Sequence, residues 1–178
     1  ALLGLNFEQA AEAAAQASHD QICQAANDND PTQVVISGHK EAVERAMEIA
    51  KGMGARRAML LPVSAPFHCA LMEPAAHAMA EALSEVNIDR PAVPLIANVL
   101  AHDVSDPATI RSLLVEQITH SVRWRESVQW LAAHEVSEIW EIGAGKTLCG
   151  MIRRIAKEIE TRAIGAPDDV VAAANPLK

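Results

Sequence analysis

Residues 62–72 read Pro-Val-Ser-Ala-Pro-Phe-His-Cys-Ala-Leu-Met, and the pattern of the sequence changes on either side of them. Before this stretch, short apolar segments and two amphipathic helical segments follow one another. After it, helical segments and single strands alternate. Pro62 and Pro66 interrupt regular structure, whereas Pro74 is compatible with the first turn of a following helix. The stretch therefore marks a boundary in the fold, and it carries His68 at its centre.

The residues before this stretch predict four strands and two helices. We expect the strands at 1–5, 22–26, 32–37 and 56–61, and the helices at 6–17 and 39–53. Asn6 and Gln9 form a capping-box pattern at the first helix, and residues 27–31, Asn-Asp-Asn-Asp-Pro, are typical of a turn. The order strand, helix, strand, strand, helix, strand is that of a ferredoxin-like unit. We therefore expect a ferredoxin-like small subdomain at 1–61.

Residues 62–178 predict a second α/β region, in which alternating helices and strands favour a parallel sheet. We expect helices at 72–86, 107–118, 125–134 and 146–158, strands near 95–97, 137–142 and 161–166, and a tail from 168. Asp106-Pro107 is expected to cap and start the helix at 107–118. The helix at 72–86 has an apolar stripe that includes Met79 and Val86, and the helix at 146–158 has one that includes Leu148. Both stripes are expected to be buried.

Composition narrows the class of protein. Half of the 178 residues are hydrophobic, and the formal charge of −8 argues against broad binding to nucleic acid or to anionic membranes. No apolar run approaches the length of a membrane span. The three cysteines, Cys23, Cys69 and Cys149, show no Cys-x-x-Cys spacing, so neither a disulfide framework nor a metal site is expected, and a reducing cytoplasmic setting fits best. The sequence opens Ala-Leu-Leu-Gly-Leu without an initiator methionine, which suggests a fragment.

Three features invite chemical interpretations that compete with structural ones. His68 between a loop and a helix is suited to acid–base chemistry, although a lone histidine more often only decorates a helix start. Gly143-Ala144-Gly145-Lys146-Thr147 resembles a phosphate-binding loop, but Trp140 stands where that pattern needs its first glycine, so a tight turn is favoured. Gln117 lies on the apolar face of its helix, which aims a polar side chain or a free carbonyl toward the core.

A serine nucleophile would need a Gly-x-Ser-x-Gly elbow between a strand and a helix. None of the eight glycines builds one. Ser64 is close to His68 in sequence but lies in the same loop, which makes it a poor candidate nucleophile. If His68 is a general base, its serine is therefore not in this chain.

Three blocks together carry a family resemblance. They are residues 27–38, where Asn27, Asn29 and Pro31 precede Gln-Val-Val-Ile-Ser-Gly; residues 62–72, quoted above; and residues 141–148, Glu-Ile-Gly-Ala-Gly-Lys-Thr-Leu. In this order and at this spacing they resemble the malonyl-CoA:acyl-carrier-protein transacylases of bacterial fatty-acid synthesis, over nearly the whole chain. The resemblance implies that 62–178 is the C-terminal part of a large α/β-hydrolase-like subdomain. It also implies that a segment before residue 1 carries the nucleophilic serine.

The resemblance implies a ping-pong transfer of malonyl from coenzyme A to the phosphopantetheine thiol of an acyl carrier protein, through an ester of that serine. His68 would be the acid and base, oriented by the main-chain carbonyl of Gln117. Asn27 and Asn29 would lie near the acyl or pantetheine path, and Phe67 before His68 would favour malonyl. No metal or redox cofactor is implied.

The implied partners are malonyl-CoA, the carrier protein and the missing N-terminal segment of the same enzyme. That segment could be supplied as a second chain. Arg153 and Arg154 would form a carrier-docking point on an otherwise acidic protein. Two alternatives remain open: an acyltransferase domain of a polyketide synthase, and a non-catalytic ferredoxin-like binding module.

Overall fold

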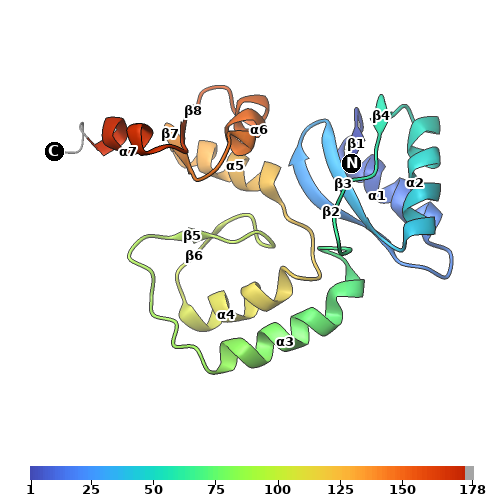
Figure 1. Cartoon of the computed structure of the whole chain (residues 1–178), viewed down its shortest axis with the longest axis horizontal. Helices are drawn as coiled ribbons and strands as arrows, with labels where there is room; N and C mark the ends of the chain where they lie inside the picture. The colour runs from blue at the N-terminus through green and yellow to red at the C-terminus, as the bar shows by residue number, and fades with distance from the viewer. Residues whose placement is uncertain (175–178) are drawn as a thin grey trace. The chain divides into compact units, whose positions relative to one another are not determined.

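The computed structural model describes residues 1–174, which form two compact units (Figure 1). Unit 1 is Ala1–Ser127, and unit 2 begins at Val128. The division falls inside helix α5 (Trp124–Ala133). It does not test the subdomain boundary predicted at residue 61, which stays a prediction. Across the described residues, every helix is too short or too polar to cross a membrane.

A four-stranded antiparallel sheet forms the first part of unit 1. Its strands lie in the order β2-β3-β1-β4, so the first strand in sequence sits inside the sheet. Leu2 pairs with Val34 on one side and with Ala58 on the other. The bounds are β1 (Leu2–Leu3), β2 (Cys23–Asp30), β3 (Gln33–Gly38) and β4 (Arg57–Ala58). The predicted order of strands and helices is confirmed, but β4 is much shorter than the expected 56–61.

Helices α1 (Phe7–Ser18) and α2 (Lys40–Gly52) pack against each other and against this sheet. Alanines make close packing possible, and the buried ones are Ala10, Ala13, Ala14, Ala17, Ala42, Ala46 and Ala50. The predicted capping box is present at α1: Asn6 Oδ1 accepts from Gln9 N–H, and the Gln9 side chain accepts from Asn6 N–H. Between sheet and helix, Gly38 has no room for a side chain, because a Cβ there would lie 2.0 Å from the Ile22 carbonyl oxygen.

The turn predicted at 27–31 begins only at Pro31, because strand β2 continues through residues 27–30. Local turn propensity is overridden by pairing on both edges of the strand. Asn27 pairs with Val35 of β3, and on the other edge Asp28 N–H donates to the Val122 carbonyl at 2.9 Å. The reversal between β2 and β3 is confined to residues 31–32.

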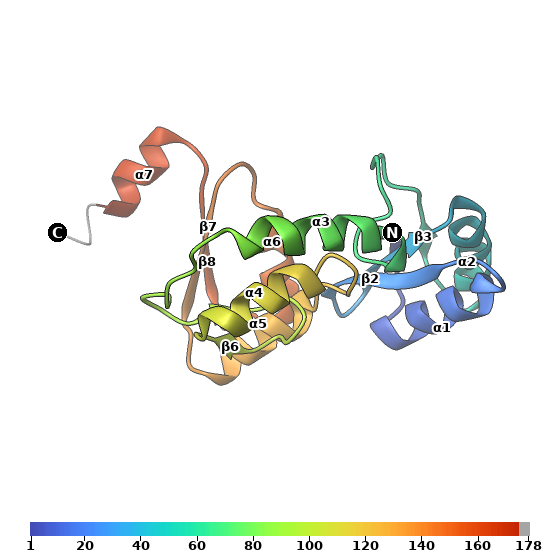
Figure 2. The same cartoon turned by 90° about the horizontal axis from the view of Figure 1, so that it is seen from below.

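The rest of unit 1 consists of a long loop, the 3₁₀ turn η1, two helices and a short hairpin. The bounds are η1 (Ala70–Met72), α3 (Glu73–Ser84), β5 (Leu95–Ile96), β6 (Asp103–Val104) and α4 (Pro107–Glu116). Helices α3 and α4 lie side by side in both views (Figures 1 and 2). A small core of Ala97, Val104, Ile110 and Leu113 joins the hairpin to α4. The predicted cap is confirmed, since Asp106 accepts from Thr109 N–H at the start of α4.

Two expectations for this region are wrong. Strand β5 pairs antiparallel with β6 rather than entering a parallel sheet. The stripe expected to be buried in the helix at 72–86 is mostly exposed: its one buried residue is Ala76, whereas Met79 of α3 and Val86, beyond the end of α3 at Ser84, are 40% and 47% exposed. The reason is that α3 packs mainly against η1 and α4, which cover little of its apolar face.

In unit 2, β7 (Glu138–Ile142) and β8 (Glu160–Ile164) form a parallel pair in register from Glu138 with Glu160. The parallel pairing predicted for this part of the chain is therefore present. Helix α6 (Thr147–Ile155) packs against both strands, and α7 (Pro167–Ala174) packs against β8. Helix α6 ends before the predicted residue 158, and Leu148 is exposed rather than buried. The tail predicted from 168 is helical to Ala174, and its last four residues lie outside the described part.

Candidate active site

His68 lies in the irregular segment between β4 and η1, and contacts on both sides hold it in place. Its backbone φ is +60°, a left-handed conformation that a non-glycine residue keeps only where its surroundings enforce it. The neighbouring Cys69 is fully buried, and its thiol donates to the Pro66 carbonyl at 3.1 Å. Ala70 N–H donates to Gln24 Oε1 on β2 at 2.8 Å. The loop that carries the imidazole is therefore anchored to the sheet.

The imidazole of His68 contacts the end of helix α4. Its Nδ1 lies 2.8 Å from the main-chain oxygen of Gln117, which is 49 residues away in the sequence. A carbonyl oxygen can only accept, so Nδ1 carries the hydrogen of this bond. In the neutral ring Nε2 then holds the lone pair, and this is the form that can remove a proton from a hydroxyl or a thiol.

The Gln117 carbonyl is available because Gln117 is the C-terminal cap of α4. The last carbonyls of an α-helix lack partners within the helix and point beyond its end. They also carry the negative end of the helix dipole, which favours positive charge nearby. This carbonyl therefore orients the neutral ring, and its partial negative charge would stabilise the ring in its protonated form.

Two pockets within unit 1 border His68. One is polar, about 250 Å³ in volume, and its lining includes Gln24, His68, Glu73, Thr119, His120 and Ser121. The other is apolar, about 340 Å³, and its lining includes Phe67, His68, Met72, Met79, Gln117 and Ile118. Phe67 is 47% exposed, so a large apolar ring next to the imidazole faces solvent rather than the core. The ring of His68 thus stands between a polar and an apolar cavity.

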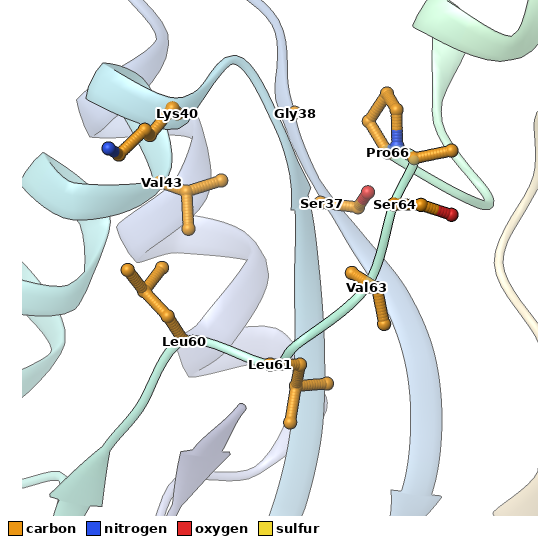
Figure 3. Close-up of a pocket in the computed structure, with 10 residues that line it drawn as sticks. Ser37, Gly38, Lys40, Val43, Leu60, Leu61, Val63, Ser64 and Pro66 are labelled. Atoms are coloured by element: carbon orange, nitrogen blue, oxygen red, sulfur yellow. The ribbon is translucent and has the colours of Figure 1, made fainter.

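A third pocket, of about 350 Å³, lies against the start of α2 and the segment before His68. Figure 3 shows Lys40 and Val43 of α2 on one side of it, and Val63 and Ser64 of the loop on the other. Its lining residues provide neither an imidazole nor a carboxylate that could activate the Ser64 hydroxyl. We therefore place the candidate site at His68 rather than in this pocket.

The predicted site residues are only partly brought together. His68, Gln117 and Phe67 share the apolar pocket. Asn27 and Asn29 lie on β2 and are half-buried, but they line neither of the two pockets at His68.

The predicted docking arginines, Arg153 and Arg154, lie in the last turn of α6 in unit 2. Arg153 Nε donates to the Thr161 hydroxyl at 3.0 Å.

The glycine-rich turn at 143–147 does not leave an anion site at the start of α6. Glu141 accepts from Leu148 N–H at 3.1 Å and from Cys149 N–H at 2.8 Å. These bonds, the one from Cys149 above all, lower the pKa of the Glu141 carboxyl. The chain's own carboxylate thus occupies the amides that a phosphate would need, which supports a structural turn.

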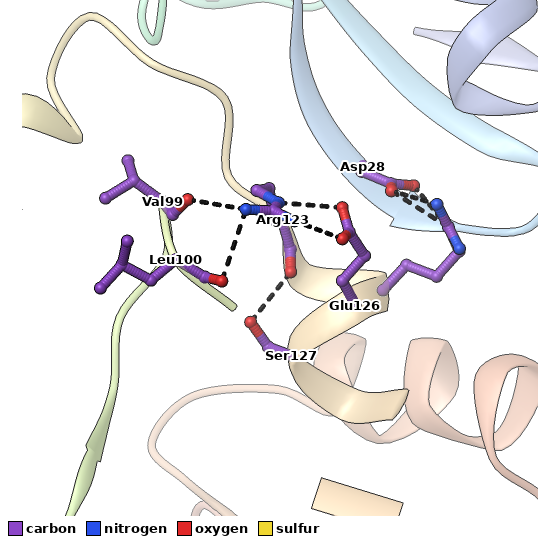
Figure 4. A network of polar contacts seen from close by, with 7 residues as sticks. Asp28, Val99, Leu100, Arg123, Glu126 and Ser127 are labelled. Carbon is purple, nitrogen blue, oxygen red and sulfur yellow. Dashed lines mark hydrogen bonds and ion pairs between the residues drawn. The ribbon is translucent and has the colours of Figure 1, made fainter. Parts of the chain in front are cut away.

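Several residues that support the site were not predicted. Arg123 donates to the carbonyls of Val99 and Leu100 and pairs with Glu126, while Asp28 pairs with Arg125 (Figure 4). A short bond from the Ser121 hydroxyl to the Ala25 carbonyl joins the segment after Gln117 to β2. Two amide side chains were not predicted either: Gln24, which accepts from Ala70 N–H, and Asn98, which donates to the side-chain oxygen of Gln117. A single amide on a strand or just after one gives no periodic signal in the sequence.

Comparison with known protein families shows to which family this chain belongs. The family model described as "Acyl transferase domain" matches residues 2–174. This chain belongs to the acyl transferase domain family.

Named relatives of this acyl transferase domain are malonyl CoA-acyl carrier protein transacylases, which confirms the predicted resemblance. The protein from Salmonella typhimurium is 42% identical over 173 residues, covering 97% of this chain and 56% of that protein. A crystal structure of acyl-carrier-protein-S-malonyltransferase from Bartonella henselae is 50% identical with a TM-score of 0.94, covering 99% of this chain and 56% of that one. The chain spans little more than half the length of these relatives.

A further matching structure is described as a type II polyketide synthase acyl-carrier protein in complex with its malonyl-transacylase. It is 38% identical with a TM-score of 0.93, and the match covers 97% of this chain and 56% of that one.

Proposed function

We propose that this acyl transferase domain transfers malonyl from malonyl-CoA to the phosphopantetheine thiol of an acyl carrier protein, through an ester on a serine outside the 178 residues. The observation that carries the proposal is the bond from His68 Nδ1–H to the Gln117 carbonyl, which leaves Nε2 free to act as a base. The names of the relatives supply the substrate class. The absence of a Gly-x-Ser-x-Gly elbow from the 178 residues supports the proposal that the nucleophile lies on another segment.

In the first half-reaction, Nε2 of His68 takes the proton of the serine hydroxyl while the serine oxygen attacks the thioester carbonyl of malonyl-CoA. The C–S bond then breaks, and the departing coenzyme A thiolate receives that proton from Nε2. In the second half-reaction, Nε2 takes the proton of the carrier's thiol while the sulfur attacks the serine ester. The C–O bond breaks and the serine oxygen regains the proton, so the enzyme returns to its starting state without a metal or a redox group.

The Gln117 carbonyl does in this scheme what a carboxylate does in many triads. It keeps the hydrogen on Nδ1 and stabilises the positive charge that the ring acquires in each half-reaction. Because a carbonyl carries only a partial charge, the ring is held without a permanent anion beside it.

We assign residues 1–61 to a ferredoxin-like small subdomain and 62–178 to the C-terminal part of a large α/β-hydrolase-like subdomain. The antiparallel order β2-β3-β1-β4 supports the first assignment. The parallel pairing of β7 with β8 supports the second.

For substrate contacts we propose Phe67, together with Asn27 and Asn29. Phe67 is favoured by its exposure in the apolar pocket beside His68. The two asparagines stand on resemblance alone, since they line neither pocket at His68.

Carrier docking is proposed at Arg153 and Arg154, on a chain whose net charge is −8. A complex of a carrier protein with a related malonyl-transacylase supports a carrier partner. Reversing both charges, Arg153→Glu with Arg154→Glu, should raise the KM for the carrier and leave that for malonyl-CoA unchanged. An unchanged carrier KM would count against this docking point.

The function is tested by incubating the chain with malonyl-CoA and carrier protein, with and without a second polypeptide that holds the serine elbow. Intact-mass measurement should detect a malonyl ester on the second polypeptide and malonyl on the carrier only when both parts are present. Transfer by the 178 residues alone would show that the nucleophile is misplaced. Binding of carrier with no acyl-enzyme in the complete mixture would favour a non-catalytic module.

A further inference from the structure

We propose that Asn98 is a positioning residue for the acid–base histidine, acting through the side chain of Gln117. This inference rests on the proposed function, in which the Gln117 carbonyl must face Nδ1 of His68. Asn98 touches neither the imidazole nor any reacting atom in that scheme. Its role is to keep Gln117 in one orientation.

Gln117 makes two contacts that depend on the same backbone conformation. Its main-chain oxygen lies 2.8 Å from His68 Nδ1, and its side-chain Oε1 accepts from Asn98 Nδ2, also at 2.8 Å. Gln117 stands at the end of α4, where helices fray most readily. A rotation of its backbone would break both bonds together, so holding the side chain also holds the carbonyl.

Asn98 can act as an anchor because its own backbone is fixed by a different part of the fold. Its carbonyl accepts from Arg123 N–H at 3.0 Å. The Arg123 guanidinium donates to the next two carbonyls, at 3.0 Å for Val99 and 3.4 Å for Leu100 (Figure 4). The anchor therefore stands on the turn after β5 rather than on α4, and it does not fray with the helix that it holds.

The same bond affects which nitrogen of His68 carries the proton. If Gln117 moves away, Nδ1 loses its acceptor and the neutral ring can place its hydrogen on either nitrogen. A ring with hydrogen on Nε2 presents no lone pair to a serine or a thiol. Loss of the Asn98 amide should thus lower the fraction of His68 that is competent as a base.

The first test is nitrogen NMR of the His68 imidazole in the 178-residue chain. The Nδ1–H tautomer should dominate in the unchanged chain, and Asn98→Ala should produce a mixture of both tautomers. Asn87→Ala is the matched control, because it removes an exposed amide that donates to Asp89 at 3.0 Å. It should leave the tautomer unchanged. A single Nδ1–H tautomer in Asn98→Ala would overturn the proposal.

Two more variants separate positioning from general stability. Gln117→Ala keeps the main-chain carbonyl but loses the side-chain tether, and it should give the same tautomer mixture as Asn98→Ala. In Asn98→Asp, the Gln117 amide can turn so that its N–H group donates to the carboxylate, which should restore the single tautomer. If Asn98→Asp behaved like Asn98→Ala while both melted at the same temperature, the proposed tether would be wrong.

Kinetics give a second readout in the complete mixture with the serine-bearing polypeptide. Asn98→Ala should lower kcat by about 10- to 100-fold while the KM for malonyl-CoA changes by less than about twofold. An unchanged kcat would overturn the role of Asn98. If His68→Ala kept full activity, the proposed function would fail instead, and the NMR result would still report the Asn98 tether by itself.

Discussion

Asp28 and Arg125 form an ion pair inside unit 1 between two segments that lie 97 residues apart in the sequence. The Arg125 Nε is 3.0 Å from each carboxylate oxygen, and its terminal nitrogen is 2.8 Å from one of them. The Asp28 side chain is only 1% exposed. Burial raises the pKa of the Asp28 carboxyl, and the guanidinium offsets only part of this effect. The pair ties β2 to the chain that follows Gln117.

Asp28→Ala should lower the free energy of unfolding by about 1.5–3 kcal/mol, because it removes the hydrogen bonds that the buried carboxylate accepts from the Arg125 guanidinium. Chemical denaturation of the 178-residue chain measures this. Glu44→Ala is the control, since Glu44 is half exposed and lies 3.9 Å from Lys40; it should cost less than about 1 kcal/mol. Equal losses for the two variants would contradict a structural role for the buried pair.

Helix α1, capped by Asn6, and helix α4, capped by Asp106, should differ in how much their caps stabilise the fold in acid. Hydrogen bonds from the Thr109 hydroxyl and N–H lower the pKa of Asp106, so the folded state binds its proton less tightly than the unfolded state does. The cap therefore stabilises α4 above the unfolded pKa of about 3.9 and is lost as the pH falls through the lower folded value.

The loss caused by Asp106→Ala should accordingly be full at neutral pH and vanish in strong acid. Asn6→Ala at α1 is the control, because its amide does not titrate; it should cost about 1 kcal/mol throughout. Denaturation of both variants across the acid range checks this. An Asp106→Ala loss that persisted unchanged in strong acid would show that the carboxylate is not the cap.

The three thiols should be protected in the native chain. Cys23, Cys69 and Cys149 are all buried, and burial raises the pKa of Cys23 to about 11. A thiol reagent at mildly alkaline pH should modify none of them until denaturant is added, and then all three, as counted by mass spectrometry. Rapid labelling of Cys23 in the native state would contradict its burial.

The raised pKa of Cys23 determines whether the free energy of unfolding rises or falls at alkaline pH. Between the unfolded pKa of about 8.5 and the folded value, the unfolded chain loses the Cys23 proton first. The free energy of unfolding should thus fall as the pH rises through this range, and fall less steeply in Cys23→Ala. Identical slopes for the two proteins would rule out this contribution.

Phe67 should influence the choice of acyl group. Its exposed ring lines the apolar pocket at His68, so Phe67→Ser should admit the extra methyl of methylmalonyl. The ratio of kcat/KM for methylmalonyl-CoA to that for malonyl-CoA should rise by about 10-fold, measured in the complete mixture. Val63→Ser, in the pocket of Figure 3, is the control and should leave the ratio unchanged. A ratio unaffected by Phe67→Ser would remove Phe67 from the substrate site.

Local signals in the sequence predicted local structure well. Asn6 with Gln9, and Asp106 with Pro107, marked helix starts that the structure confirms. The failures came from long-range contacts: residues 27–31 have turn propensity but pair with β3 and with Val122, and α3 has a buried-type stripe that its neighbours leave exposed.

The candidate site was also only partly predictable, because local signals mark single residues but not the long-range contacts between them. The composition of the loop and the apolar face of α4 pointed to His68 and Gln117 separately. Their contact across 49 residues was expected only from the family resemblance, and it is present. Asn98 could not be found from sequence, because its role depends on a turn held by Arg123.

In the proposed mechanism, His68 is the base that activates a serine on another segment. Its most direct test is the rate of malonyl-ester formation in the mixture of this chain, the serine-bearing polypeptide and malonyl-CoA, for the unchanged chain and for His68→Ala. His120→Ala is the matched control, since His120 also lines the polar pocket and its Nδ1 also contacts a main-chain carbonyl, that of Glu116. We expect the rate of ester formation to fall by at least about 1,000-fold for His68→Ala and to stay nearly unchanged for His120→Ala. Near-normal ester formation by His68→Ala would contradict it.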